Sequence, residues 1–230
     1  MSNRASHQEL LRKLQEKYQP FLTGKNEFTY DGPSNWDIWE TEKLKILFLV
    51  KEARLGYHPC VKEQPTTSRF SRSIARWKIA IKKSIINNEK ILLPKNYELP
   101  KYNDDVAIVE VKKLNEEKSF SNNGQICHYA NQDKDFLKRQ IDLLSPNVIV
   151  CCSTFQSYNI IYQNIYTVKK KLHSVDKCNS WLLDNRLVID FFHPSTFHKT
   201  SKYLFETIAE LSNHDNIQMN IPNFVKQNGS

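Results

Sequence analysis

Short apolar runs alternate along the chain with longer segments in which apolar residues recur every three or four positions. Each run is five or six residues long and almost continuously apolar, which is typical of strands that are covered on both faces. The four runs cover residues 46–50, 106–111, 147–152 and 187–192. We therefore expect these strands to form the parallel centre of a sheet.

Amphipathic helical patterns lie between these runs. Residues 68–85 carry apolar side chains on one face, and residues 136–144 and 201–211 repeat that spacing. The N-terminal residues 3–18 are predicted to form a polar, charged helix. Strands that alternate with helices indicate βαβ units. We expect an α/β fold, a single-domain three-layer α/β/α arrangement with a central, mainly parallel sheet, whose ligand lies beyond the carboxyl ends of the strands.

The chain length of 230 residues suits one large domain. No internal repeat is present, and the loops expected at residues 26–35 and 95–105 are too short to be domain linkers. The tail from about residue 213 onward is polar and rich in asparagine, so its last residues are expected to fray. The simplest organisation is one domain that spans residues 1–230.

The glycine and cysteine contents exclude several kinds of site. The five glycines are widely separated, whereas a Gly-rich nucleotide-binding loop needs several glycines within one turn. The five cysteines include no C-x-x-C pair, so no zinc or iron–sulfur site is predicted. Cys151 and Cys152 lie inside an apolar run and are predicted to be reduced core thiols. We expect a protein that uses no cofactor and no metal.

Positive charge is in excess, because 33 Lys+Arg against 25 Asp+Glu give a formal net charge of +8. This balance favours polyanionic partners, among them nucleic acid. No apolar run approaches the roughly 18–20 residues of a membrane span, and the charged N-terminus lacks the apolar core of a secretory signal. We expect a cytoplasmic monomer that makes no membrane contact.

Polar side chains gather where three of the predicted strands end. The first strand runs into residues 51–59, KEARLGYHP, which combine a carboxylate with several cations and rings. The second passes through Glu110, which has apolar neighbours, and an unpaired charge there would be costly. The fourth ends in His193-Pro194-Ser195. Each feature alone fits an ordinary loop or a structural side chain, and their occurrence together favours a functional site.

Taken together, these segments resemble the uracil-DNA glycosylase superfamily. Residues 136–150, FLKRQIDLLSPNVIV, look like the helix of that family which ends before a buried strand. Residues 106–114, VAIVEVKKL, resemble its second motif strand, with Glu110 where the family usually has a base-reading asparagine and Lys113 where a lysine often follows. The resemblance covers residues 44–208, and the order of the segments carries more weight than the short His-Pro-Ser motif.

The resemblance implies a glycosylase that hydrolyses the N-glycosidic bond of a flipped-out base and leaves an abasic site. Glu52 would orient water or stabilise the positively charged sugar, and His193 would donate a hydrogen bond to the base oxygen. Phe197 would fill the gap in the base stack as a wedge, with core packing as the alternative. The first motif leaves two registers open, with either Glu52 or Ala53 in the catalytic place.

Glu110 bears on the choice of base. An ionised carboxylate only accepts hydrogen bonds, so Glu110 suits a base with an exocyclic amine, such as a cytosine derivative. Some divergent members of the superfamily act on glucosylated hydroxymethylcytosine in phage DNA as antiviral defence, and the residues around Arg54, Tyr57 and His58 would line a roomier pocket for such a sugar. The base-binding residues expected from the resemblance are Glu110, Tyr57, Arg54 and Lys113. Uracil is the alternative base.

The DNA-binding surface is expected on two parts of the chain. Arg69, Arg72, Arg76 and Lys83 form one stripe on the helix at 68–85, with a solvated helix face as the alternative. The remaining expected DNA contacts are Lys51, Ser195, His198 and the wedge Phe197.

Three other functions compete with the glycosylase. A catalytically silent nucleic-acid-binding module on the same fold would keep the basic stripe and release no base. A small-molecule enzyme would use a pocket at the strand ends without binding nucleic acid. A cysteine hydrolase fails, because a cysteine-phosphatase loop needs an arginine six residues after its cysteine, and Ser157 and Tyr158 stand there. A buried strand cysteine is also a poor thiolate.

Overall fold

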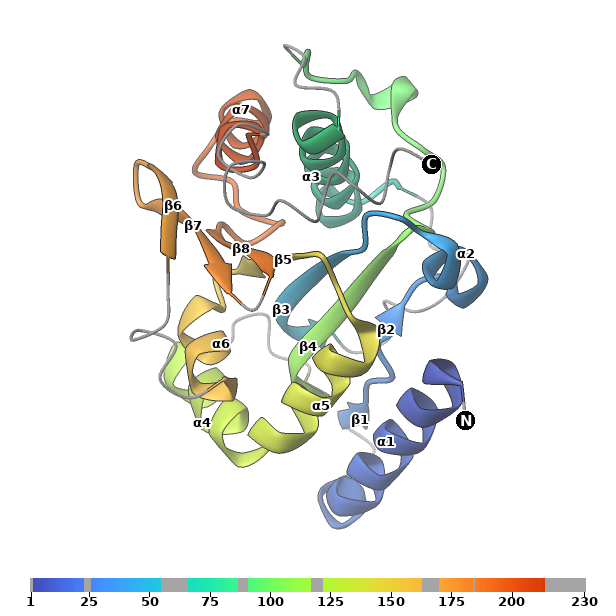
Figure 1. Cartoon of the computed structure of the whole chain (residues 1–230). Helices are drawn as coiled ribbons and strands as arrows, with labels where there is room; N and C mark the ends of the chain where they lie inside the picture. Colours follow the sequence, from blue (N-terminus) through green and yellow to red (C-terminus); the bar gives the residue numbers. More distant parts are fainter. Residues whose placement is uncertain are drawn as a thin grey trace.

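A computed structural model describes residues 2–22, 26–54, 66–86, 91–116, 122–162, 170–183 and 185–213. One mixed sheet lies between two layers of helices (Figure 1). Its strand order is β1-β4-β3-β5-β8-β7-β6, and β2 pairs with β4 off this path. The expected three-layer α/β/α architecture is confirmed.

The centre of the sheet is parallel, as predicted. It consists of β4 (Val106–Glu116), β3 (Ile46–Arg54), β5 (Val148–Cys152) and β8 (Arg186–Phe191). Both faces of these strands are covered, and all five residues of β5 are buried, including the thiols of Cys151 and Cys152. After β3 the chain forms β4 along one edge of β3, and it then crosses back to form β5 along the other edge of β3. The gap beyond β3 and β5 is therefore the switch point where ligands bind in such sheets.

The edges of the sheet are antiparallel and were not predicted. The segment 26–35, which we expected to be a loop, contains β1 (Asn26–Phe28) and β2 (Gly32–Pro33), both paired with β4. Strands of two or three residues are too short to produce an alternating pattern. The hairpin of β6 (Lys170–Val175) and β7 (Cys178–Leu183) extends the sheet from β8.

The helices pack in two layers around the sheet (Figure 1). α3 (Arg69–Ile86) and α7 (Ser201–Leu211) cover one face, where Phe48 and Val150 face their apolar sides. The opposite face packs against α4 (Asn123–Gln132), α5 (Lys134–Leu144) and α6 (Phe155–Ile161). Beside α5, α1 (Asn3–Tyr18) closes a small third core with Phe28 and Leu114. The elements α2 (Trp36–Thr41), η1 (Gln19–Phe21) and η2 (Asn96–Glu98) complete the described helical segments.

The helix predictions agree closely with the structure. α1 and α7 have the predicted bounds, α3 is displaced by one residue at each end, and α5 begins two residues earlier than expected. α5 ends at Leu144, and its C-cap Ser145 has a left-handed φ of 46° and precedes Pro146. The first strand continues past its predicted end at residue 50, because Glu52 and Arg54 still pair with β4.

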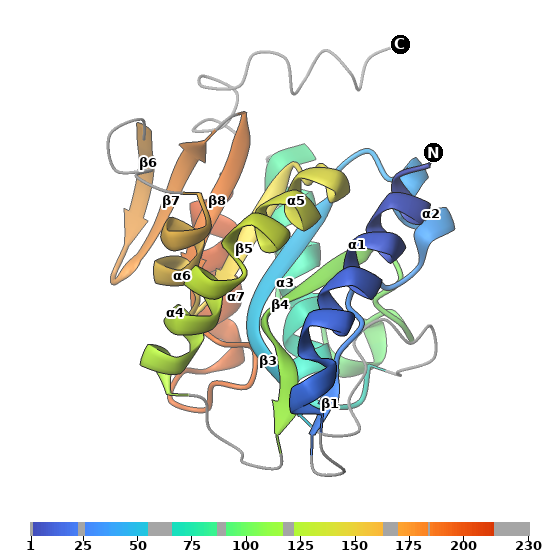
Figure 2. The same cartoon turned by 90° about the horizontal axis from the view of Figure 1, so that it is seen from below.

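β3 and β4 run side by side toward the lower edge of the sheet in Figure 2. Since β5 and β8 are parallel to them, the polar residues that end these strands belong to one edge. No helix in the described part of the chain is long and apolar enough to cross a membrane.

Candidate functional site

An ion pair lies at the carboxyl ends of β3 and β4. Glu52 and Lys112 are direct partners in the parallel ladder, and the Lys112 Nζ lies 2.9 Å from the Glu52 Oε2. Both side chains are largely removed from solvent, so the ammonium fixes where the carboxylate lies. The Lys112 Nζ also lies 5.4 Å from the centre of the Tyr129 ring. The neighbouring Lys51 donates to the Asn123 Oδ1 at 2.7 Å and so ties β3 to the first residue of α4.

His193 lies just beyond the end of β8 in a tight turn. The amide of Ser195 donates to the His193 Nδ1 at 3.2 Å, and the amide of Thr196 donates to the His193 carbonyl at 2.9 Å. A ring nitrogen that accepts a hydrogen bond carries no proton, so the neutral ring holds its proton on Nε2. The ring centre lies 6.1 Å from that of Phe70 in the first turn of α3. The half-buried His193 therefore lies at the sheet edge with its Nδ1 bonded to the following turn.

The two candidate catalytic groups lie on β3 and just beyond β8, and only β5 lies between these two strands. Neighbouring strands are about 4.8 Å apart, so the ends of β3 and β8 lie about 10 Å apart. The end of β5 is tied to both neighbours, because the Ser153 amide donates to the Phe191 carbonyl at 2.8 Å and the Thr154 hydroxyl donates to the Leu49 carbonyl at 2.8 Å. Glu52 and His193 therefore belong to the same edge of the sheet, on either side of the end of β5.

Glu110 lies deeper in β4, opposite Val50 and only 1% exposed. Its backbone amide donates to the Asp31 Oδ2 at 2.6 Å. Lys113, also fully buried, forms an ion pair with Asp31 and donates to the Gln140 Oε1 at 2.9 Å. The two β4 residues that the sequence assigned to the base are thus linked through one buried aspartate.

The network continues to the N-terminal helix. The Gln140 amide donates to the Asp31 Oδ1 at 2.6 Å and lies 3.1 Å from the His7 Nε2. Burial lowers the pKa of His7 from 6.5 to about 4, an effect that Asp31 opposes and Lys113 assists. Gly32 has a φ of +125°, and a Cβ there would lie 2.7 Å from the His7 Cε1, so glycine is required. Sequence reasoning missed His7, Asp31 and Gln140, since no spacing pattern links them.

The expected DNA-contacting residues lie on exposed or half-buried surface. Phe197 is 69% exposed and its ring centre lies 4.0 Å from that of His198, so it is not part of the core. Arg69 is exposed, Arg72 donates to the Thr67 carbonyl, and Arg76 donates to the Asn96 Oδ1 at 2.5 Å. Burial, assisted by the charge of Arg72, lowers the pKa of Arg76.

Four predicted positions lie wholly or partly outside the described residues. Tyr57 and His58 lie outside them altogether. Arg54 and Ala53 belong to the backbone of β3, and their side chains are outside the described set. Glu52 is described together with its partner Lys112, and the choice between Glu52 and Ala53 for the catalytic place stays a prediction.

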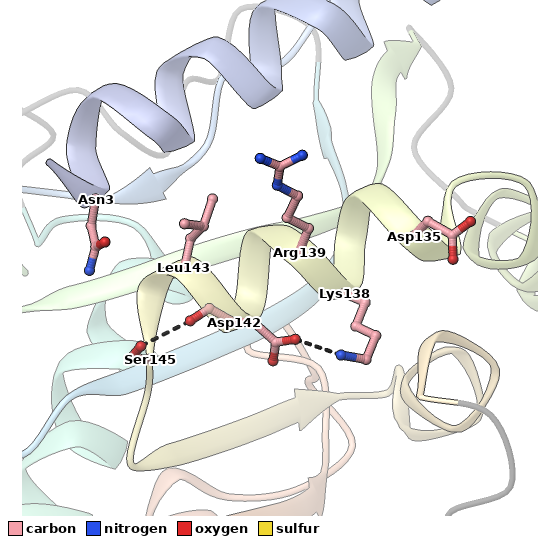
Figure 3. Close-up of a pocket in the computed structure, with 7 residues that line it drawn as sticks. All are labelled: Asn3, Asp135, Lys138, Arg139, Asp142, Leu143 and Ser145. Atoms are coloured by element: carbon pink, nitrogen blue, oxygen red, sulfur yellow. Dashed lines mark hydrogen bonds and ion pairs between the residues drawn. The ribbon is translucent and has the colours of Figure 1, made fainter. Parts of the chain in front are cut away.

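A surface hollow of about 520 Å³ lies along the outer side of α5 (Figure 3). Its walls are charged, with Asp142 accepting from the Lys138 ammonium at 2.7 Å, and Arg139 beside it. The lining residues run along α5 from Asp135 to Ser145 and include Asn3 of α1, and none of them is a site residue expected from the sequence. Within the described ranges, no group of three or more His, Cys, Asp or Glu side chains could hold a metal ion.

Comparison of the sequence with protein-family models and with curated protein sequences finds no match to either.

Proposed function

We propose that the protein is a DNA glycosylase that hydrolyses the N-glycosidic bond of a flipped-out base and leaves an abasic site. The observation that supports this most is the placement of a carboxylate and an Nε2–H imidazole on either side of β5. Glu52 is held by Lys112 at 2.9 Å, and His193 is oriented by the Ser195 amide at 3.2 Å. A nucleoside consists of a sugar and a base, and in this proposal Glu52 acts on the sugar while His193 acts on the base.

Each group has a defined part in the reaction. As the bond between the sugar C1′ and the base nitrogen breaks, its electron pair moves onto the base and positive charge develops on the sugar. The His193 Nε2–H donates to the base oxygen on which negative charge collects. The Glu52 carboxylate stabilises the sugar cation and orients the water that adds to C1′. The proton of that water balances the charge of the departing base.

The proposed base is a modified cytosine, such as a glucosylated hydroxymethylcytosine of phage DNA, which would make the enzyme part of antiviral defence. Glu110 supports this choice, because its carboxylate accepts from an exocyclic amine and the Asp31 contact fixes its backbone. In this account Lys113 holds the base-binding strand through Asp31, and Arg54 and Tyr57 contact the modified base. We place this activity in the cytoplasm, carried out by a monomer.

DNA is held around this site by the exposed residues near it. Phe197 enters the base stack as the wedge, and Ser195, His198 and Lys51 contact the adjacent backbone. Arg69, Arg72 and Arg76 contact phosphates along α3. Phe70 connects the cations of α3 with the residues around His193. It follows Arg69 in the chain, and its ring packs near that of His193.

The test is incubation of the protein with duplexes that each carry one candidate base, followed by alkali cleavage at abasic sites. We expect cleavage at a cytosine derivative to exceed cleavage at uracil. Uracil excision above that of every cytosine derivative would refute the role of Glu110. DNA binding without cleavage of any duplex would favour the catalytically silent nucleic-acid-binding module.

A further inference from the structure

The outer surface of α3 carries a second chain segment along much of its length. Residues 91–105 return from the end of α3 to the start of β4 and lie beside the helix (Figure 1). Arg76 donates to Asn96, the Lys101 carbonyl accepts from the Thr66 amide at 2.9 Å, and Asn103 donates to the Ser71 carbonyl at 3.0 Å. The segment is therefore attached to α3 at two points and to Thr66, just before the helix, at a third.

This surface is rich in cations. Arg69 and Lys83 are 14 residues apart on α3, which corresponds to about 21 Å. Among the described residues, no carboxylate forms an ion pair with any cation of this surface. The cations are Arg69, Arg72, Arg76, Lys83, Lys95 and Lys101. By contrast, Lys78 and Lys82 of the same helix are paired with Asp105. These six cations outnumber Glu98, the carboxylate that the same surface carries, and the net positive charge is complementary to a polyanion.

An exposed aromatic ring stands in the middle of these cations. Tyr97 in η2 is 77% exposed, and the Lys95 ammonium lies 5.6 Å from its ring centre. The Glu98 carboxylate accepts from the Lys95 amide at 2.6 Å and closes the turn that presents the ring. Leu92, 80% exposed, lines an adjacent hollow of about 610 Å³ between α3 and residues 91–98. Tyr97 therefore offers an exposed ring face beside a cation, and an aromatic ring among cations is the combination found on surfaces that bind single nucleic-acid strands.

We propose that this surface, formed by the exposed side of α3 and residues 91–101, binds a single nucleic-acid strand, with Tyr97 as the platform on which an unpaired base stacks. Phosphates contact the cations, and the base rests on the tyrosine face, which is the combination used by single-strand-binding surfaces. A duplex keeps its bases stacked and offers only its phosphates to this surface. The end of the surface at Arg69 adjoins Phe70 and hence His193, so the bound strand leads to the candidate catalytic edge.

This inference deepens the proposed function, on which its biological meaning rests, but its test is a binding measurement. The probe is a fluorescent oligothymidine of roughly twelve nucleotides, compared with a duplex of the same length. Tyr97→Ala is expected to weaken single-strand binding about tenfold and duplex binding less than twofold, while Tyr97→Phe keeps the stacking face and the affinity. Phe21→Ala removes another exposed aromatic, 59% exposed and outside this surface, and serves as the matched control.

Equal single-strand affinities for Tyr97→Ala and Phe21→Ala would overturn the inference. Equal loss on duplex and single strand would overturn the assignment of Tyr97 to an unpaired base. If Tyr97→Ala weakens single-strand binding but the wild type releases no base from any DNA, the glycosylase proposal is refuted and the binding surface stands. Base release with unchanged binding by Tyr97→Ala would leave the enzyme intact and refute this surface.

Discussion

Lys112 is the residue that fixes the position of the Glu52 carboxylate. The pair is buried, and its two members are adjacent in the β3–β4 ladder. The sequence showed Glu52 as a polar residue after a strand, and the structure adds the partner. Neither the pairing nor the extension of β3 to Arg54 could be predicted, because polar residues 51–54 carry no strand pattern and depend on their hydrogen bonds with β4.

Replacing Lys112 by methionine should lower the free energy of unfolding by about 3 kcal/mol, because it removes the ammonium that lies 2.9 Å from a largely buried carboxylate. Urea denaturation of the wild type and the variant measures this difference. The double variant Glu52→Gln with Lys112→Met should recover part of the loss. A Lys112→Met protein as stable as the wild type would show that the pair does not constrain Glu52.

His7 should make stability depend on pH. Its folded pKa of about 4 lies below the unfolded value of 6.5, so between these values the unfolded chain binds a proton that the folded chain does not. Stability from this group is complete above pH 6.5 and is lost as the pH falls toward 4, by up to about 3 kcal/mol. The cost of His7→Gln measured at pH 7 should therefore shrink by pH 4.5.

The measurement compares His7→Gln with the wild type because Asp190 changes the pH dependence of stability in the opposite direction to His7. Burial raises the pKa of Asp190 from 3.8 to about 6, so it adds stability as the pH falls through that range. Both proteins contain Asp190, and its contribution cancels in the difference. A cost of His7→Gln that stays constant from pH 7 to pH 4.5 would contradict the assignment of a neutral buried histidine.

Among the strands and helices, the length and continuity of the apolar pattern decided which elements could be predicted from the sequence. The four parallel strands carry continuous apolar runs and the helices α1, α3, α5 and α7 carry helical patterns, and the sequence predicted them. β1 and β2 hold only three and two residues, and the half-exposed β6–β7 hairpin lacks the apolar run of a covered strand. These edge elements form because β4 and β8 present unpaired backbone groups beside them.

The β2 turn depends on one glycine. Gly32→Ala should lower the free energy of unfolding by about 1–3 kcal/mol, because φ at this position is +125° and a Cβ would meet His7. Thermal or urea denaturation measures the effect. Gly124→Ala, inside α4, has ordinary helical backbone and should change stability by less than about 1 kcal/mol. Equal effects at the two glycines would contradict the described packing of β2 on α1.

The basic stripe of α3 should set the salt dependence of DNA binding. Removing one cation that binds a phosphate should lower the slope of log K against log salt by roughly 0.9. Arg69→Gln is therefore expected to flatten the slope, measured by fluorescence titration at several salt concentrations. Arg139→Gln on the exposed side of α5 removes the same charge and should leave the slope unchanged. Identical slopes for both variants would remove α3 from the DNA interface.

For the molecule as a whole, the sequence predicted the architecture and the edge at which polar residues gather. Chain order shows which residues follow each strand, whereas the distances between them follow from the strand order, which places β5 between β3 and β8. The buried network of His7, Asp31, Lys113 and Gln140 joins four distant segments. Such a network depends on three-dimensional packing, and residue spacing contains no signal for it.

The central claim is that Glu52 and His193 catalyse base release from DNA. The most direct measurement is single-turnover release of free base, detected by mass spectrometry, alongside the DNA affinity of each protein. We predict that Glu52→Gln and His193→Ala each slow release at least about 100-fold with DNA affinity unchanged, while the exposed-surface control Glu206→Gln matches the wild type. Unchanged release in both catalytic-site variants, or DNA binding by the wild type with no base released, would contradict the account.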